Sequence, residues 1–224
     1  MKDILVVWDV DGTLIDAKDC GREALNRTFY KIFGIENGFR GVSLSGRLDA
    51  CIVEDALKQN NISYANMDLF FDTYVKILED VIKNKKYIQI LPGIKEILQC
   101  ENQDHIFHIL GTGNIERGAR IKLKAHEIDE YFLLGGFGDD KVQRWQMVQK
   151  AIEKAQKFKE INYLNENIYV IGDTTKDIYC AKKLGVRSIA VSTGSDTKEE
   201  LFKDEPDYLF ENLGDIQKFF DLFL

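Results

Sequence analysis

Short apolar runs, each followed by small or polar residues, recur along the 224-residue chain. The first run, from Ile4 to Trp8, is apolar at every position, which is typical of a strand buried on both faces of a parallel sheet. Similar runs lie at residues 106–110, 131–134, 168–171, 188–191 and, as an edge strand, 208–210. Because helical patterns separate these runs, the sequence predicts an α/β fold with a doubly wound parallel sheet of Rossmann-like type.

Between about residues 16 and 90 the apolar positions follow a helical period instead. Three stripes at this spacing begin near Ala24, Ile52 and Phe70. We therefore expect an α/β core from residues 1–15 and 91–224, with an all-helical cap from 16–90 inserted after the first strand. Ligands bind at the carboxyl ends of such sheets, so an insertion at this point is placed to act as a lid.

Composition favours a soluble cytoplasmic protein. The formal charge of −7 gives no electrostatic reason to bind nucleic acid or an anionic membrane, and no apolar run approaches the roughly 18 residues of a transmembrane helix. Met1 is followed almost directly by the first strand, which leaves no room for a signal peptide. The four dispersed cysteines indicate a reducing compartment, not disulfides or zinc. We expect a monomer or homodimer that binds a small molecule.

Two acids stand at the exit of the first strand. Asp9 and Asp11 repel each other and are costly to desolvate unless a cation or a proton lies between them. An ordinary Asp-Gly turn accounts for Asp11 and Gly12, but it does not account for Asp9.

Two further polar clusters follow later strands. The stretch from Thr112 to Asn114 follows the run at 106–110, and Asp173 with Asp177 follows the run at 168–171. Since the carboxyl ends of parallel strands converge, these clusters should face the first two acids. Carboxylates suit Mg²⁺, and a glycine-rich turn at a helix start suits an anion, so the combination indicates phosphoryl chemistry.

These motifs resemble those of the haloacid dehalogenase (HAD) superfamily of hydrolases. The resemblance rests on the sequence DVDGTL from Asp9 to Leu14, on the Thr-Gly-Asn motif and on GDTTKD from Gly172 to Asp177. It covers residues 9 to about 194, and the helical insertion resembles the small-cap subgroup that includes phosphoglycolate phosphatases and β-phosphoglucomutases. The resemblance implies a Mg²⁺-dependent phosphatase for small phosphorylated metabolites. A sugar phosphomutase using the same residues is the alternative. A receiver-type phospho-acceptor module is less favoured, because receivers lack the insertion and the second acid.

The resemblance also implies roles for individual residues. Asp9 would attack phosphorus to give an aspartyl-phosphate, and Asp11 would protonate the leaving group and later deprotonate water. Thr112, with Gly113 and Asn114, would bind the phosphoryl oxygens.

For the metal, the resemblance implies that Mg²⁺ would be bound by the Asp9 carboxylate, the Asp11 carbonyl and Asp173. Asp177 would contact the ion indirectly, through water.

The family also needs a basic residue after the third strand, often in a Lys-Pro pair, which this chain lacks. The candidates are Lys141 and Arg144. Arg144 lies seven residues before Ala151, a spacing seen in some relatives, and arginine can clamp phosphate with two hydrogen bonds. We favour Arg144, with Lys141 as the alternative.

A cap segment completes the candidate site. Gly46 and Arg47 lie where relatives often carry a Gly-Arg/Lys-Thr-Asp loop that reaches the substrate, although Leu48 replaces the threonine here. We expect Gly46 and Arg47 to contact the substrate; the alternative is that Arg47 is an exposed charge.

Overall fold

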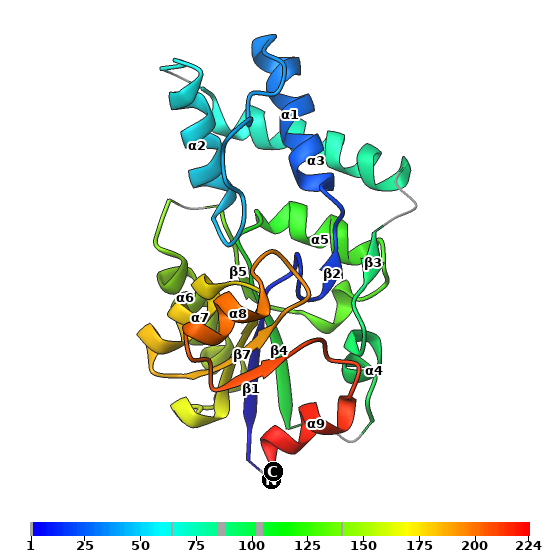
Figure 1. The fold of residues 1–224 in the computed structure, drawn as a ribbon, viewed down its shortest axis with the longest axis vertical. Coiled ribbons are helices and arrows are strands. Elements are labelled where there is room, and N and C mark those ends of the chain that lie inside the picture. The colour runs from blue at the N-terminus through cyan, green and yellow to red at the C-terminus, as the bar shows by residue number, and fades with distance from the viewer. Residues whose placement is uncertain (1, 64, 85–87, 102–104, 140) are drawn as a thin grey trace.

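The core of the molecule is a six-stranded parallel sheet with strand order β5-β4-β1-β6-β7-β8 (Figure 1). The computed structural model describes residues 2–63, 65–84, 88–101, 105–139 and 141–224. The strands are β1 Ile4–Trp8, β4 Ile106–Gly111, β5 Gly135–Gly136, β6 Ile168–Gly172, β7 Arg187–Val191 and β8 Tyr208–Phe210. β8 forms the edge predicted from its short apolar run.

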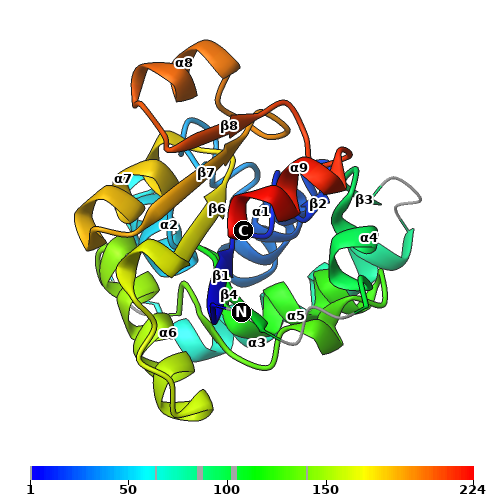
Figure 2. The same cartoon turned by 90° about the horizontal axis from the view of Figure 1, so that it is seen from below.

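Helices cover both faces of the sheet (Figure 2). One face carries α6 Arg144–Lys159 and α7 Thr175–Leu184; the other carries α4 Ile94–Leu98, α5 Glu116–Lys124 and α9 Ile216–Phe220. Along β1, Leu5 and Val7 pack with the α6 and α7 side chains, whereas Val6 and Trp8 belong to the cluster on the opposite face. This double burial explains why β1 is apolar throughout. The remaining short helices are α8 Lys198–Lys203 and the 3-10 turns η1 Asp129–Tyr131, η2 Asn165–Asn167 and η3 Asp221–Phe223.

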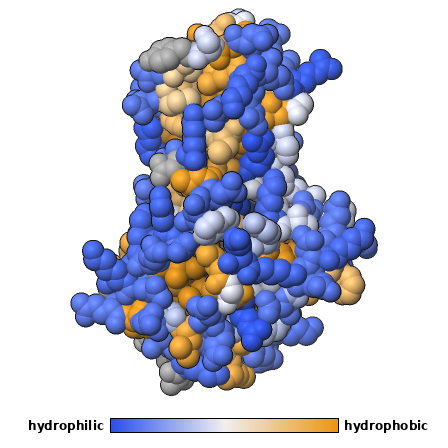
Figure 3. All heavy atoms as spheres, turned by 90° about the vertical axis from the view of Figure 1, so that its left-hand side faces the viewer, coloured by the Kyte–Doolittle hydropathy of each residue, from blue (hydrophilic) through white to orange (hydrophobic). Residues whose placement is uncertain are grey.

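Three helices form a separate lobe above the carboxyl ends of the strands (Figure 1). They are α1 Cys20–Phe33, α2 Asp49–Gln59 and α3 Met67–Asn84, and we call them, with their connecting segments, the cap. Two short strands, β2 Ile15–Asp16 and β3 Gln89–Ile90, pair antiparallel where the chain enters and leaves the cap. The space-filling view shows the upper lobe joined to the wider lower lobe through a waist (Figure 3). The residue limits 16–90 for a cap domain stay a prediction.

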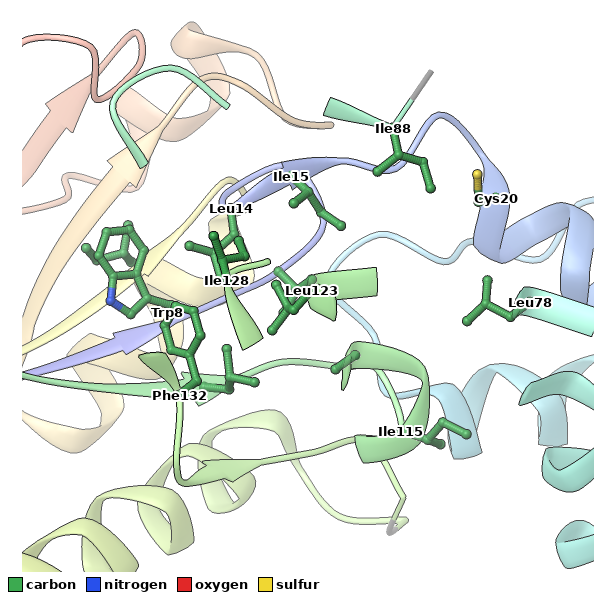
Figure 4. Close-up of a cluster of buried hydrophobic side chains, with 14 of the residues drawn as sticks. Trp8, Leu14, Ile15, Cys20, Leu78, Ile88, Ile115, Leu123, Ile128 and Phe132 are labelled. Atoms are coloured by element: carbon green, nitrogen blue, oxygen red, sulfur yellow. The ribbon is translucent and has the colours of Figure 1, made fainter. Parts of the chain in front are cut away.

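One hydrophobic cluster is continuous from the sheet into the cap. Figure 4 shows it running from Trp8 and Phe132 at the sheet through Leu123 to Leu78 of α3. The cap and the sheet therefore share part of one hydrophobic core. Among the described helices, none combines the length and apolarity that a bilayer span needs.

The expected strand at 131–134 is wrong. Tyr131 ends the 3-10 turn η1, Leu133 is 63% exposed, and the strand is instead the two-residue β5. A Cβ on Gly136 would lie only 2.5 Å from the Met147 carbonyl oxygen, so the close approach of α6 requires glycine there. Phe132, in the apolar run before β5, is fully buried in the core although it follows a 3-10 turn and is not in a strand. Hydropathy alone does not distinguish these two ways of burying an apolar run.

Candidate active site

The carboxyl ends of β1, β4 and β6 meet beneath the cap at a cavity of about 620 Å³. Asp9 follows β1, and its backbone N–H donates to the Ile171 carbonyl of β6 at 2.9 Å. Thr112 follows β4, and Asp173 follows β6. Of the sequence-predicted site residues, those lining the cavity are Asp9, Asp11, Gly46, Arg47, Thr112, Gly113, Asn114, Arg144 and Asp173.

Three buried carboxylates form the floor of the site. Oxygen atoms of Asp9, Asp173 and Asp177 all lie within 4.8 Å of one another. Arg144, the first residue of α6, places Nη2 2.7 Å from Asp177 Oδ1 and 3.1 Å from Asp9 Oδ1. One guanidinium faces three carboxylates, so negative charge predominates when all are ionised.

Burial and the neighbouring charges shift the pKa values of these carboxyl groups. Burial raises the pKa of Asp9 to about 6, against the lowering effect of Arg144. Burial also raises the pKa of Asp173 well above its usual range, and the neighbouring carboxylates of Asp9 and Asp177 add to the rise. Hard oxygen donors with unbalanced negative charge are the environment that Mg²⁺ prefers, so these residues fit that ion.

Asp177 already has other partners. Its Oδ2 accepts hydrogen bonds from Thr174 N at 3.2 Å and Thr174 Oγ1 at 2.7 Å, and its Oδ1 accepts from Arg144. This arrangement is compatible with indirect contact to a metal ion; that role, like the whole ligand set, stays a prediction.

The two candidate basic residues lie in different surroundings. Arg144 is buried against the carboxylates, whereas Lys141 is exposed and its Nζ lies 3.4 Å from Glu54 Oε2 on α2 of the cap. The structure therefore brings Arg144 to the predicted site and does not bring Lys141 there.

Asp11 is held by two other side chains. Its Oδ2 accepts hydrogen bonds from Asn114 Nδ2 at 2.8 Å and from Lys122 Nζ at 2.6 Å. Its Oδ1 is buried and has no hydrogen-bond partner. Sequence reasoning missed Lys122. The signal was a lysine on the apolar face of α5, spaced three and four residues from Ala119 and Gly118.

The cap docks on the loop that carries Thr112. The Asp49 backbone N–H donates to the Gly113 carbonyl at 2.8 Å, and the Asp49 carboxylate accepts from Ile115 N at 2.9 Å. A Cβ on Gly113 would lie 2.0 Å from the Arg47 carbonyl oxygen, so only glycine permits this contact. Burial raises the pKa of Asp49 to about 7, against the lowering effect of Lys122. Asp49 was not predicted as a site residue.

The same cap segment also reaches the opposite wall of the site. The Ser45 carbonyl accepts from Lys176 Nζ, and the Ser45 and Ser195 hydroxyls are hydrogen-bonded, each contact at 2.5 Å. The Arg47 guanidinium pairs with Asp55 within the cap, also at 2.5 Å. Contact of this segment with a substrate stays a prediction.

Comparison with known proteins decides the family. A model of the haloacid dehalogenase-like hydrolases matches residues 6–191, which include both acids after β1, the Thr-Gly-Asn motif and the acids after β6. The chain belongs to this family. The match confirms the expected fold class and the expectation of an enzyme, and it agrees with the parallel sheet and its flanking helices.

Relatives of this hydrolase carry the names of phosphatases. The chain is 27% identical to a protein of Caldanaerobacter subterraneus subsp. tengcongensis named for the pyrophosphatase PpaX, over 97% of this chain and 94% of the relative. It is 22% identical to a phosphoglycolate phosphatase of Pseudomonas putida, over 93% of this chain and 76% of the relative.

Solved structures share the fold. A predicted phosphoglycolate phosphatase from Haemophilus somnus superposes with a TM-score of 0.71 at 18% identity, covering 98% of each chain. A hydrolase from Pseudomonas syringae gives the same TM-score and identity, covering 97% of this chain and 98% of its own.

Proposed function

We propose that this hydrolase is a Mg²⁺-dependent phosphatase that cleaves small phosphate esters through an aspartyl-phosphate on Asp9. One observation carries the proposal: Asp9 lies in a buried carboxylate cluster beside Arg144, and Asp11 lines the same cavity. A nucleophile, a cation and a proton-transfer group are the parts that phosphoryl transfer from an ester to a carboxylate requires.

In the first step, an Asp9 carboxylate oxygen attacks phosphorus and the bond from phosphorus to the ester oxygen breaks. Asp11, entering this step protonated, donates its proton to the departing alkoxide. Arg144 offsets the repulsion between the Asp9 carboxylate and the phosphate dianion, since its guanidinium already lies 3.1 Å from Asp9 Oδ1.

In the second step, Asp11 takes a proton from water as that water attacks the phosphorus atom. The bond between phosphorus and the Asp9 oxygen breaks, inorganic phosphate leaves, and both side chains return to their starting states. The use of one carboxyl group as acid and then as base follows from the order of these two steps.

Asp9, Asp173 and the Asp11 carbonyl would hold the metal ion, with Asp177 acting through water. When bound, the divalent ion would neutralise charge on the transferring phosphoryl group. The fit rests on the three buried carboxylates of Asp9, Asp173 and Asp177, whose oxygens lie within 4.8 Å of one another and whose charge Arg144 offsets only in part.

The cavity favours small substrates. The cap contacts the core on two sides of the site, through Asp49 at Gly113 and through Ser45 at Ser195. This leaves about 620 Å³ for the ester. The names of the relatives, phosphoglycolate phosphatase and pyrophosphatase, support a small anionic phosphate compound as the substrate.

The test is phosphate release from a panel of small esters, with and without Mg²⁺. We expect release that requires Mg²⁺, stops in EDTA and is lost in Asp9→Asn. Full activity in EDTA would overturn the metal assignment. Transfer of the phosphoryl group to a sugar phosphate, with no free phosphate, would instead indicate a phosphomutase.

A further inference from the structure

Two helices that begin at the boundary between cap and core lack a cap residue of their own. The cap helix α2 starts at Asp49 and the core helix α5 at Glu116. The residues just before them, Leu48 and Ile115, have apolar side chains that offer no hydrogen-bond acceptor. Because the first N–H groups of a helix have no partner within the helix, they need acceptors from elsewhere. Each helix draws such an acceptor from the other side of the boundary.

These contacts across the boundary are reciprocal. The Asp49 N–H donates to the Gly113 carbonyl at 2.8 Å, and the Ala50 N–H donates to the Gly138 carbonyl at 3.1 Å. In the other direction, the Asp49 carboxylate accepts from the Ile115 N–H at 2.9 Å, directly before α5. Asp49 is only 8% exposed, so these hydrogen bonds are shielded from water. One cap residue therefore holds the core chain at two points, on either side of a single residue.

Two glycines allow the main chains to come this close. A Cβ on Gly138 would lie 1.8 Å from the Gly113 carbonyl oxygen and 2.9 Å from the Asp49 nitrogen. A Cβ on Gly113 would lie 2.0 Å from the Arg47 carbonyl oxygen. Real Cβ atoms essentially never approach other heavy atoms to less than 3.0 Å, so any larger residue would push the chains apart. The core loops at this edge are thus shaped to receive the cap main chain.

The contact with the cap also sets the direction of a peptide unit in the turn. A trans peptide is planar, so the Gly113 C=O and the Asn114 N–H point in opposite directions. Because the C=O is turned toward Asp49, the N–H is turned inward, where it donates to Thr112 Oγ1 at 3.3 Å. From the core side, the Gly138 N–H donates to the Asn114 carbonyl at 2.7 Å. The shape of the turn therefore depends on the docked cap as well as on the core.

We propose that Asp49 is a positioning residue that holds the turn from Thr112 to Asn114 in the shape that receives the phosphoryl group. The inference rests on the proposed function, in which this turn binds the phosphoryl oxygens. Because the same contacts dock the cap and shape the turn, docking and phosphoryl binding are coupled. By thermodynamic linkage, each strengthens the other by the same factor. The anion site is complete only when the cap is docked.

The opposing interpretation is that Asp49 only fastens the cap. A residue with that role alone would affect the melting midpoint and leave anion affinity unchanged well below it. Asp49→Ala removes the acceptor for the Ile115 N–H, whereas Asp49→Asn keeps an oxygen acceptor of the same reach. Glu54→Ala is the matched control, because it removes an acid from the same helix whose partners are Lys58 and, across the boundary, Lys141.

The first experiment measures the Kd of inorganic phosphate by titration calorimetry, with Mg²⁺ present, in wild type and these three variants. We expect Asp49→Ala to raise the Kd about tenfold, within the range of about 5- to 150-fold that coupling between sites spans. Asp49→Asn and Glu54→Ala should bind phosphate nearly as wild type does. An unchanged Kd in Asp49→Ala would overturn the inference, as would equal losses in the two Asp49 variants.

Hydrogen exchange followed by mass spectrometry tests the coupling without turnover. In wild type, phosphate should slow exchange in the cap peptide that contains Asp49 and Ala50, and the effect should be much smaller in Asp49→Ala. Exchange in that peptide that ignores phosphate in wild type would overturn the inference. If wild type hydrolyses no ester while phosphate still slows exchange there, the proposed function fails and the role of Asp49 stands. An active wild type whose phosphate affinity does not depend on Asp49 would fail the inference alone.

Discussion

Removing the Arg144 guanidinium tests how the site balances its charge. Arg144→Met roughly keeps the length of the side chain but removes its positive charge. The buried carboxylates of Asp9, Asp173 and Asp177 then lose the guanidinium that pairs with them. Removing one partner of a buried ion pair costs about 3–5 kcal/mol of unfolding free energy. Loss of a group that stabilises transition-state charge lowers kcat by about 10²–10³. We therefore expect a variant that folds less stably and hydrolyses every ester tested more slowly.

Magnesium makes the prediction sharper. A ligand at 100 times its Kd stabilises the folded state by about 2.7 kcal/mol. Because Arg144→Met carries one more uncompensated negative charge, its melting midpoint should rise more with Mg²⁺ than that of wild type. Lys141→Met is the control, since Lys141 is exposed and pairs with Glu54 instead. A nearly silent Arg144→Met beside a crippled Lys141→Met would refute the assignment, as would equal stabilisation of both proteins by Mg²⁺.

Three further predictions concern other parts of the molecule. Gly113→Ala would place a Cβ 2.0 Å from the Arg47 carbonyl oxygen, so it should displace the cap segment at Arg47 from the Thr112 loop and lower kcat/KM; unchanged kinetics would count against this docking contact. Arg47→Ala should raise KM and reorder the preferred esters, as steady-state kinetics would show, and uniform loss of kcat would contradict a role at the leaving group. Burial lowers the pKa of His108 to about 4, whereas its value in the unfolded chain is about 6.5. Above pH 6.5 the imidazole is neutral in both states and the fold keeps its full stability. As the pH falls from 6.5 toward 4, the unfolded chain binds a proton that the folded protein does not, so stability is lost. Urea unfolding at pH 7 and pH 5 should show wild type losing up to about 2 kcal/mol more than His108→Gln, and equal losses would disprove the effect.

Most of the sheet and its catalytic edge could be predicted from local pattern. β1 is buried on both faces, so all five of its residues are apolar and the two acids after it stand out. The helices of the cap could also be predicted, because their buried residues recur at helical spacing. The end of α1 is marked by Gly34, which adopts φ 69°. These features depend on residues adjacent in sequence.

Lys122 and β5 depend instead on tertiary contacts. Lysine is a good helix former, so nothing in the local sequence distinguishes Lys122 from the other helical lysines. Only the fold shows that its amine contacts Asp11, 111 residues away. β5 consists of two glycines, and Gly136 is required because α6 approaches the strand closely. Glycine carries no apolar signal, so the sequence predicted the strand four residues too early, at the apolar run that precedes it. Asp49 was passed over because its partners lie on a loop 64 to 66 residues further along the chain.

The central claim is that Asp9 becomes phosphorylated, and rapid quenching tests it most directly. p-Nitrophenyl phosphate should label the Asp11→Asn variant, because its leaving group needs no acid while attack by water lacks its base. Borohydride reduction and peptide mass spectrometry would then locate the acyl phosphate. The account predicts one modified residue, Asp9, and no labelling when Asp9→Asn is added. Turnover by wild type with the phosphoryl group on another residue, or on none, would contradict it.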